Sequence, residues 1–431
     1  MQKPLRATDP NFEASLEEAL KKRQVRAVGV ASVVQEILQR VRDHGDPALL
    51  QYTEQFDGIR VGPGEVGVSR KEIEIAFASC ELEDIAALEF AAGRIEDFHK
   101  RQIPSEFSFT DQAGLKLATR WTPIQSVGLY VPGGQAVYPS SLLMNAIPAR
   151  LAGVERLAMV VPCPTGAVSP YLLAAAKIVG VEEIYKVGGA QAVAALAYGT
   201  KTISPVDKIV GPGNAFVAEA KRQVFGIVGI DAIAGPSEIL VVADREADPS
   251  WIAMDLLSQA EHDKDALCTL ITDDIAFAEA VEKNILIHLR NLERADIARE
   301  SWEKNGISIV VNELLEAAVL INRLAPEHVE VALGNPDPLL KRIKNAGAIF
   351  IGRYTPEAVG DYVAGPNHVL PTARSARYSS GLSVVDFCKS TNLIECDALS
   401  LQAVAQHGIT LAKREGLEAH AQSLAMRLLD E

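Results

Sequence analysis

A repeated order of helix, glycine and apolar strand constrains the fold of this chain more than any other feature. A helix predicted over residues 141–151 ends at Gly153 and is followed by an apolar strand at 157–164. The same order recurs in the next unit, where a helix at 172–179 ends at Gly180 before another apolar strand. Glycine just past a helix suits the left-handed position that other residues reach only at a cost. Such repeats are typical of a parallel sheet covered by helices on both faces.

A second region with the same alternation follows along the chain. Strands are predicted at 238–244, 266–272, 307–311 and 347–352, with helices at 249–260, 275–289 and 313–322. The two ends of the chain have helical periodicity instead, with helices expected at 16–28, 31–41 and 71–98 and two more after Ala398, separated by Gly408.

We therefore expect an α/β fold of two doubly wound, incomplete Rossmann-like parallel-sheet lobes with helical arms at both ends. The expected division is an N-terminal arm at 1–25, a first lobe at 26–129 plus 237–381, a second lobe at 130–236, and a C-terminal arm at 382–431. Arms of this kind often cross to a second subunit, so a dimer is expected in which the C-terminal arm is exchanged.

Composition excludes several classes of protein. The 42 Lys and Arg residues against 56 Asp and Glu give a net charge of −14, which argues against general nucleic-acid binding. The 5 cysteines are odd in number and scattered, without a Cys-x-x-Cys pair, which favours a reducing compartment over a disulfide framework. The N-terminus lacks the apolar core of a secretory signal, and no long apolar run could span a membrane. A cytoplasmic protein is expected.

Three glycine turns end apolar strands, at residues 131–134, 187–190 and 210–213. In a parallel sheet such turns share one edge, where ligands bind in open α/β folds and where exposed amides can meet phosphates. Each turn alone could be only a tight connection. No Gly-x-Gly-x-x-Gly fingerprint follows a strand and no Walker motif is present, so the turns indicate a cofactor pocket without naming the cofactor.

Two polar clusters follow apolar segments. Gln259 and His262 share a helix face at the end of the helix predicted over 249–260, where they could form a site or only an exposed terminus. Glu327 and His328 open an alternating strand, and both side chains can transfer protons. Because neighbours in a strand point to opposite faces, one of this pair could simply face solvent.

Two more clusters lie nearer the C-terminus. Asp361 and His368 sit in a segment dense in glycine and proline, which indicates a functional or tightly turned loop. Glu415 and His420 would lie about 140° apart in an unbroken helix. Gly416 could break the helix and let them converge.

With these residues in view, nearly the whole chain resembles the histidinol dehydrogenase family. The most specific stretch is IDAIAGPSEILVVAD continuing to DLLSQAEHD; VPGGQAVYPSS, VGPGNAFVAEAK, RLAPEHVE and GDYVAGPNHVLPT match in order and spacing. The resemblance implies a zinc-dependent, NAD-linked, four-electron oxidation of L-histidinol through L-histidinaldehyde to L-histidine, the final step of histidine biosynthesis, by a homodimer with shared sites.

The resemblance also assigns roles to residues. It implies one Zn²⁺ held by Gln259, His262, Asp361 and His420, the last from the partner's arm. It implies NAD contacts at Tyr130, Gln191 and Asn214, and catalytic bases at Glu327 and His328. The substrate contacts that it implies are Ser237, Gln259, His262, His328, Asp361, His368, Glu415 and His420. His328 would accept the alcohol proton, and Glu327 would activate water against the aldehyde.

Three alternative functions stay open. A related dehydrogenase could act on another small alcohol such as a sulfonated diol, although Glu415 would repel a sulfonate. A zinc hydrolase could use Glu327 with metal-bound water, but the glycine turns would then lack a purpose. A non-catalytic binding protein would not need polar residues in every cluster.

Overall fold

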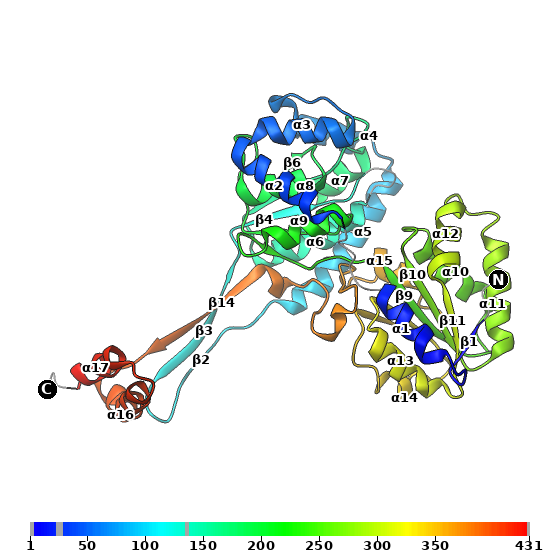
Figure 1. Cartoon of the computed structure of the whole chain (residues 1–431). Helices are drawn as coiled ribbons and strands as arrows, with labels where there is room; N and C mark the ends of the chain where they lie inside the picture. The colour runs from blue at the N-terminus through cyan, green and yellow to red at the C-terminus, as the bar shows by residue number, and fades with distance from the viewer. Residues whose placement is uncertain (1–3, 23–28, 134–137, 429–431) are drawn as a thin grey trace.

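The computed structural model describes residues 4–22, 29–133 and 138–428 (Figure 1). Two parallel sheets form separate lobes, and a three-stranded antiparallel sheet leads away from them to the C-terminal helices. The expected α/β class with two parallel-sheet lobes is confirmed. The antiparallel sheet was not expected. Within the described residues, no helix is both long enough and apolar enough to cross a membrane.

The lobe that contains residues 130–236, called the five-stranded lobe below, is built on a five-stranded parallel sheet. Its strands run in the spatial order β6 (Glu183–Tyr185), β5 (Arg156–Val160), β4 (Ser126–Tyr130), β7 (Lys208–Val210) and β8 (Gly229–Ile230). Alternate residues of β4 face different cores. Val127 and Leu129 belong to one core cluster, and Tyr130 belongs to another. Helices therefore cover both faces of this sheet, as the apolar strands predicted.

Some helices of this five-stranded lobe come from residues that were expected in the other lobe. One core contains α2 (Ala31–His44), α3 (Asp46–Asp57), α8 (Gly189–Tyr198) and α9 (Ala215–Val224); the other contains α4 (Arg70–Ser79), α5 (Leu82–His99), α6 (Pro139–Ala152) and α7 (Pro170–Ile178). The expected division grouped 26–129 with 237–381, whereas α2 to α5 pack on the five-stranded sheet. The single helical segment expected at 71–98 is interrupted between α4 and α5.

The other lobe, which contains residues 237–351 and is called the six-stranded lobe below, is built on a six-stranded parallel sheet. Its spatial order is β1 (Leu5–Arg6), β11 (Ile307–Val310), β10 (Leu267–Thr272), β9 (Glu238–Ala243), β12 (His328–Ala332) and β13 (Ala348–Ile351). One face packs against α10 (Pro249–Ala260), α11 (Ile275–His288) and α12 (Ala295–Asn305). The other packs against α1 (Phe12–Lys22), α13 (Ala317–Leu324) and α14 (Asp337–Leu340).

The N-terminal segment is part of this six-stranded lobe. Phe12, Leu16 and Leu20 of α1 are buried against Leu240 and Ile309 of the sheet, and β1 extends the sheet at its edge. The helix expected at 16–28 begins earlier than predicted, and its last six residues lie outside the described part of the chain. The N-terminal helix therefore docks on its own subunit instead of projecting from it.

The C-terminal segment begins as a strand. β14 (Cys388–Glu395) pairs antiparallel with β3 (Lys116–Pro123), which pairs with β2 (Phe107–Thr110). These strands carry α16 (Ala398–Arg414) and α17 (Glu418–Met426) away from both lobes (Figure 1). The expected C-terminal helical arm at 382–431 therefore includes a strand, and its helices begin at Ala398, where the helical pattern of the sequence begins. Leu382 and Phe387 are also buried in the five-stranded lobe.

The break between the two C-terminal helices lies at Gly416. The sequence placed it at Gly408, but α16 continues through that residue. Gly416 has φ +74°, a left-handed conformation that ends a helix at little cost for glycine. The expectation that Gly416 interrupts the helix is confirmed.

Candidate active site

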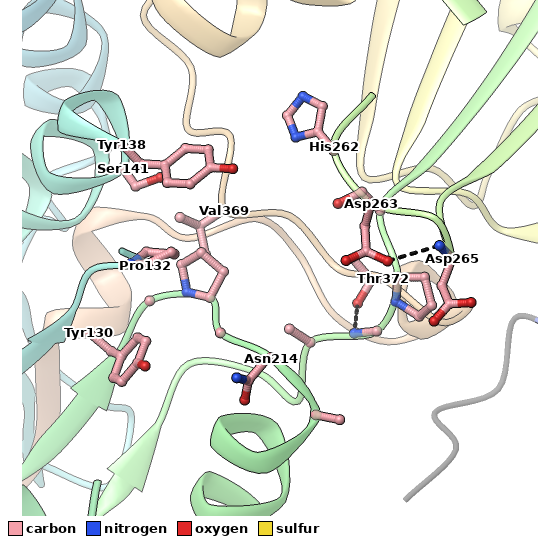
Figure 2. A pocket seen from close by; sticks show the side chains of 18 of the residues that line it. Tyr130, Pro132, Tyr138, Ser141, Asn214, His262, Asp263, Asp265, Val369 and Thr372 are labelled. Atoms are coloured by element: carbon pink, nitrogen blue, oxygen red, sulfur yellow. Dashed lines mark hydrogen bonds between the residues drawn. The ribbon is translucent and has the colours of Figure 1, made fainter. Parts of the chain in front are cut away.

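A cavity of about 1050 Å³ is lined by residues from both lobes. All three glycine turns line it, through residues such as Gly133, Gly189 and Gly211. Figure 2 shows Tyr130 and Asn214 on one side of the hollow and His262 across from them. The expectation that the three turns meet at one edge of a parallel sheet is confirmed.

Three residues expected to contact NAD lie on the wall formed by the five-stranded lobe. Tyr130, at the end of β4, accepts a hydrogen bond from the amide of Gly189 at 3.0 Å, and burial raises its pKa to about 12. Asn214 caps α9 by accepting from the amides of Phe216 and Val217. Gln191 is 1 % exposed, and its amide has no partner among the described residues. A buried amide without partners carries an unpaid desolvation cost, so a ligand that hydrogen-bonds to it would be favoured.

A buried ion pair holds the third glycine turn. Lys221 pairs with Asp231, and both side chains are at most 5 % exposed. The Lys221 ammonium donates to the carbonyl of Gly211 at 2.8 Å, while the Gly211 amide donates to Asp231 at 2.7 Å. Gly211 has φ +111°, and an added Cβ would lie 2.1 Å from the carbonyl oxygen of Tyr130. Position 211 can therefore only be glycine, and the ion pair fixes the orientation of its amide and carbonyl groups.

The Glu327–His328 pair lies on the opposite wall, at the start of β12. Both residues are buried, at 7 % and 4 % exposed, and both line the cavity. Glu327 accepts from the backbone amide of Glu238 at 3.0 Å. Burial, reinforced by the charge of Asp361, raises the pKa of Glu327 well above its ordinary value. The possibility that one member of the pair only faces solvent is therefore excluded.

The tautomer of His328 follows from its neighbours. Its Nδ1 lies 2.9 Å from the carbonyl oxygen of Glu238 and 3.2 Å from a carboxylate oxygen of Glu357. A proton on Nδ1 satisfies the carbonyl, which leaves the lone pair on Nε2. That Nε2 has no partner among the described residues, and burial lowers the pKa of His328 to about 4. The imidazole is therefore neutral at pH 7 and can accept a proton.

A group of buried carboxyls lies behind His328. Glu330 accepts from the backbone amide of Glu357 at 2.6 Å, and both side chains are 3 % exposed. Burial raises the pKa of both well above the ordinary value and raises the pKa of Asp255, on α10, to about 6. These three acids link β12, α15 (Glu357–Tyr362) and α10, the elements that carry His328, Asp361 and Gln259.

Most of the expected metal ligands share the cavity. Gln259, His262 and Asp361 all line it, and the buried Oε1 of Gln259 has no partner among the described residues. Ligand atoms of His328, Glu357 and Asp361 also lie within 4.8 Å of one another, a cluster able to hold a cation that shares only Asp361 with the expected set.

Two further expected substrate contacts, Ser237 and His368, line the same cavity. His368 Nδ1 lies 3.0 Å from the carbonyl oxygen of Asp361, and its Nε2 lies 3.3 Å from Ser141 Oγ. These contacts place His368 where the two lobes meet, because Ser141 belongs to α6.

The structure does not bring Glu415 and His420 to the cavity of their own chain. Glu415 ends α16 and His420 lies in α17, at the tip of the extension that leads away from both lobes (Figure 1). Neither residue lines the cavity, and both are exposed. Within one chain, three of the four expected metal ligands are together.

Sequence reasoning missed several residues of the site. Lys221, Asp231 and Glu357 were not singled out, although each contacts a functional segment. A lysine inside an amphipathic helix normally predicts a solvated face, so no local signal identifies Lys221 as buried.

Comparison with known proteins agrees with this geometry. Residues 20–428 match the family model described as histidinol dehydrogenase. The chain is 57% identical over 425 residues to the histidinol dehydrogenase of Rhodospirillum rubrum, covering 98% of each chain. It is 55% identical over 420 residues to that of Rhizobium meliloti, covering 97% of each. The crystal structure of histidinol dehydrogenase from Elizabethkingia anophelis matches with a TM-score of 0.93 at 33% identity, covering 99% of this chain and 98% of that one. The chain belongs to the histidinol dehydrogenase family.

Proposed function

We propose that this protein oxidises L-histidinol through L-histidinaldehyde to L-histidine. Two NAD molecules each accept one hydride, and each site holds one zinc ion. The observation that carries the proposal is the buried Glu327–His328 pair, with an unpartnered His328 Nε2, in a cavity whose opposite wall is made of three glycine turns. Family membership supports the same reaction.

The chemistry of the donors supports a zinc site. His262 and Asp361 supply an imidazole nitrogen and a carboxylate, which are ligand types that zinc accepts, and Gln259 adds an amide oxygen. Leaving the buried Oε1 of Gln259 without a partner costs free energy, which a bound cation would offset. We assign the fourth position to His420 of the partner subunit. Zinc, when bound, supplies a template for the imidazole and amine of histidinol.

His328 serves as the base for the alcohol. Its neutral imidazole presents the Nε2 lone pair, and the Glu238 carbonyl holds the proton on Nδ1. His328 would take the alcohol proton, and bound NAD would supply the hydride acceptor. Because a second hydrogen bond already orients the ring, the proton transfer requires little reorganisation of this base.

Glu327 activates water in the second half of the reaction. Its raised pKa makes the ionised carboxylate a stronger base than an exposed one, which suits abstraction of a proton from water. Its hydrogen bond from the Glu238 amide fixes the carboxyl at the cavity wall. Retention of the aldehyde in one cavity between the two oxidations prevents its loss to solvent.

The position of the C-terminal helices supports a homodimer with shared sites. Glu415 and His420 lie far out on the extension of their own subunit, so their assignment to the site requires a second copy to supply them. We assign Glu415 to the cationic groups of the substrate and Ser237 and His368 to its positioning. None of the 5 cysteines forms a disulfide, which supports a cytoplasmic location as a proposal.

The yield of NADH tests the function. Two NADH per L-histidinol are expected, with loss of turnover after chelation and recovery on addition of zinc. One NADH with release of free aldehyde would contradict the two-step scheme. Full activity after exhaustive chelation would contradict the zinc assignment.

A further inference from the structure

One wall of the cavity has no role in the chemistry assigned above. It is lined by Ile37 of α2, by Phe56 and Asp57 at the end of α3, and by Pro162 and Pro164 in the loop after β5. All five residues belong to the five-stranded lobe, whereas Glu327 and His328 belong to the other. Phe56 is 50 % exposed and stacks on Tyr52, so a broad apolar surface faces this part of the cavity.

Asp57 places one acceptor on this wall. Its Oδ2 is buried and has no hydrogen-bond partner among the described residues. Burial raises the pKa of Asp57 above its ordinary value, which agrees with a carboxyl that has lost water without gaining a donor. Asp57 is also the last residue of α3, where the helix dipole disfavours a negative charge. Neither burial nor helix position favours an acid here.

The chemistry of this wall suits a nucleoside. Proline and phenylalanine surfaces accommodate a flat base, and an ionised carboxylate can only accept hydrogen bonds, so its ligand must donate them. The two hydroxyls of a ribose are such donors, and acidic side chains hold ribose hydroxyls in other dinucleotide sites. The nicotinamide end of NAD must reach His328, so the adenosine end is free to occupy the five-stranded lobe.

We propose that Asp57 accepts the hydroxyls of the adenosine ribose of NAD and that its charge rejects a ribose carrying a 2′-phosphate. The inference rests on the proposed function, which it deepens by naming the group that selects NAD over NADP. A phosphate held against an unpaired carboxylate in a partly buried pocket would meet like-charge repulsion that solvent screens poorly.

Asp57→Asn tests the proposal in the full-length, zinc-loaded protein. The change keeps the shape of the side chain and removes its charge. The preference for NAD over NADP, measured as the ratio of kcat/KM values, should fall by about tenfold or more, which corresponds to ~1.4 kcal/mol. An unchanged NAD-to-NADP ratio would overturn the proposal.

Glu54→Gln is the matched control. Glu54 lies one turn earlier on the same helix, is solvent-exposed and does not line the cavity. It removes the same charge, so it should leave the ratio unchanged. An equal fall in both variants would overturn the assignment to Asp57, because general electrostatics would explain it. Asp57→Ser, compared by thermal midpoint, provides a second uncharged variant if the asparagine protein folds poorly.

A binding measurement separates this inference from the proposed reaction. Calorimetric titration with ADP-ribose and with 2′-phospho-ADP-ribose needs no turnover. The wild type should prefer ADP-ribose, and Asp57→Asn should lose that preference even if histidinol is not the substrate. If Asp57→Asn instead loses only a preference for NAD over its hypoxanthine analogue, the carboxylate binds the base and the ribose assignment is wrong.

Discussion

Glu327→Gln should separate the two oxidations of histidinol. Glutamine has nearly the shape of glutamate, and its amide oxygen can still accept the 3.0 Å hydrogen bond from the Glu238 amide. Because the two side chains have nearly the same volume, the variant loses the base without opening a cavity at this buried position. His328 keeps its own contact with the Glu238 carbonyl. The first hydride transfer should therefore continue.

The size of the effect follows from the role of a general base. Loss of such a group slows a step by about 10²–10⁴-fold, or ~3–5 kcal/mol in activation free energy. Rapid mixing of enzyme, histidinol and excess NAD should give about one NADH per histidinol and then a slow phase, where the wild type gives two. Supplied histidinaldehyde should be oxidised as slowly as in the second phase.

Glu330→Gln is the matched control for this experiment. It makes the same substitution two residues along β12, at a side chain that does not line the cavity. Two NADH per histidinol should persist. If Glu327→Gln abolishes the first hydride transfer as strongly as the second, the division of roles between Glu327 and His328 is refuted.

The other predictions concern stability and assembly. Burial raises the pKa of Glu330 in the folded state, so the unfolded chain loses its proton first and the wild type loses stability as pH rises from about 4.3 toward the folded pKa. The urea midpoint of Glu330→Gln should therefore exceed that of the wild type by more at pH 8 than at pH 4. The same pH dependence of the midpoint in both proteins would contradict this. Asp231→Asn leaves Lys221 buried without its counter-ion and should cost ~3–5 kcal/mol in urea unfolding, whereas a loss below ~1 kcal/mol would show that the pair is not buried in solution. Truncation before Glu415 should abolish turnover, and mixing that chain with His262→Asn should restore it by pairing an intact cavity with an intact arm; no recovery in confirmed heterodimers would exclude shared sites.

The parallel sheets could be predicted because their signal is local. β9 and β10 are buried along their whole length, so uniform apolar runs bounded by helices identify them. The common edge of the three glycine turns then follows from parallel order alone. Glu327 and His328 could be identified as candidates by residue type, but only the fold shows that both are buried.

The antiparallel extension could not be predicted in the same way. Seven of the eight residues of β14 are exposed, so the strand carries no hydrophobic pattern, and its partner β3 lies far away in the sequence. The sequence also could not show which of the two sheets α2 to α5 pack against. Periodicity shows that a helix has a buried face, but it does not show which sheet buries that face. The contacts of Lys221 depend on tertiary packing for the same reason.

The extension also limits how the chain can change in length. β3 and β14 pair along eight consecutive residues, so the paired strands act as a spacer that sets how far α16 and α17 stand from the lobes. Removing two residues from each strand would retract the helices by about 7 Å while keeping every side chain on its face. Removing one from each would turn the rest of the spacer over. Insertions and deletions here are therefore tolerable only as matched, even-numbered pairs, with compensation on the surface that receives the helices.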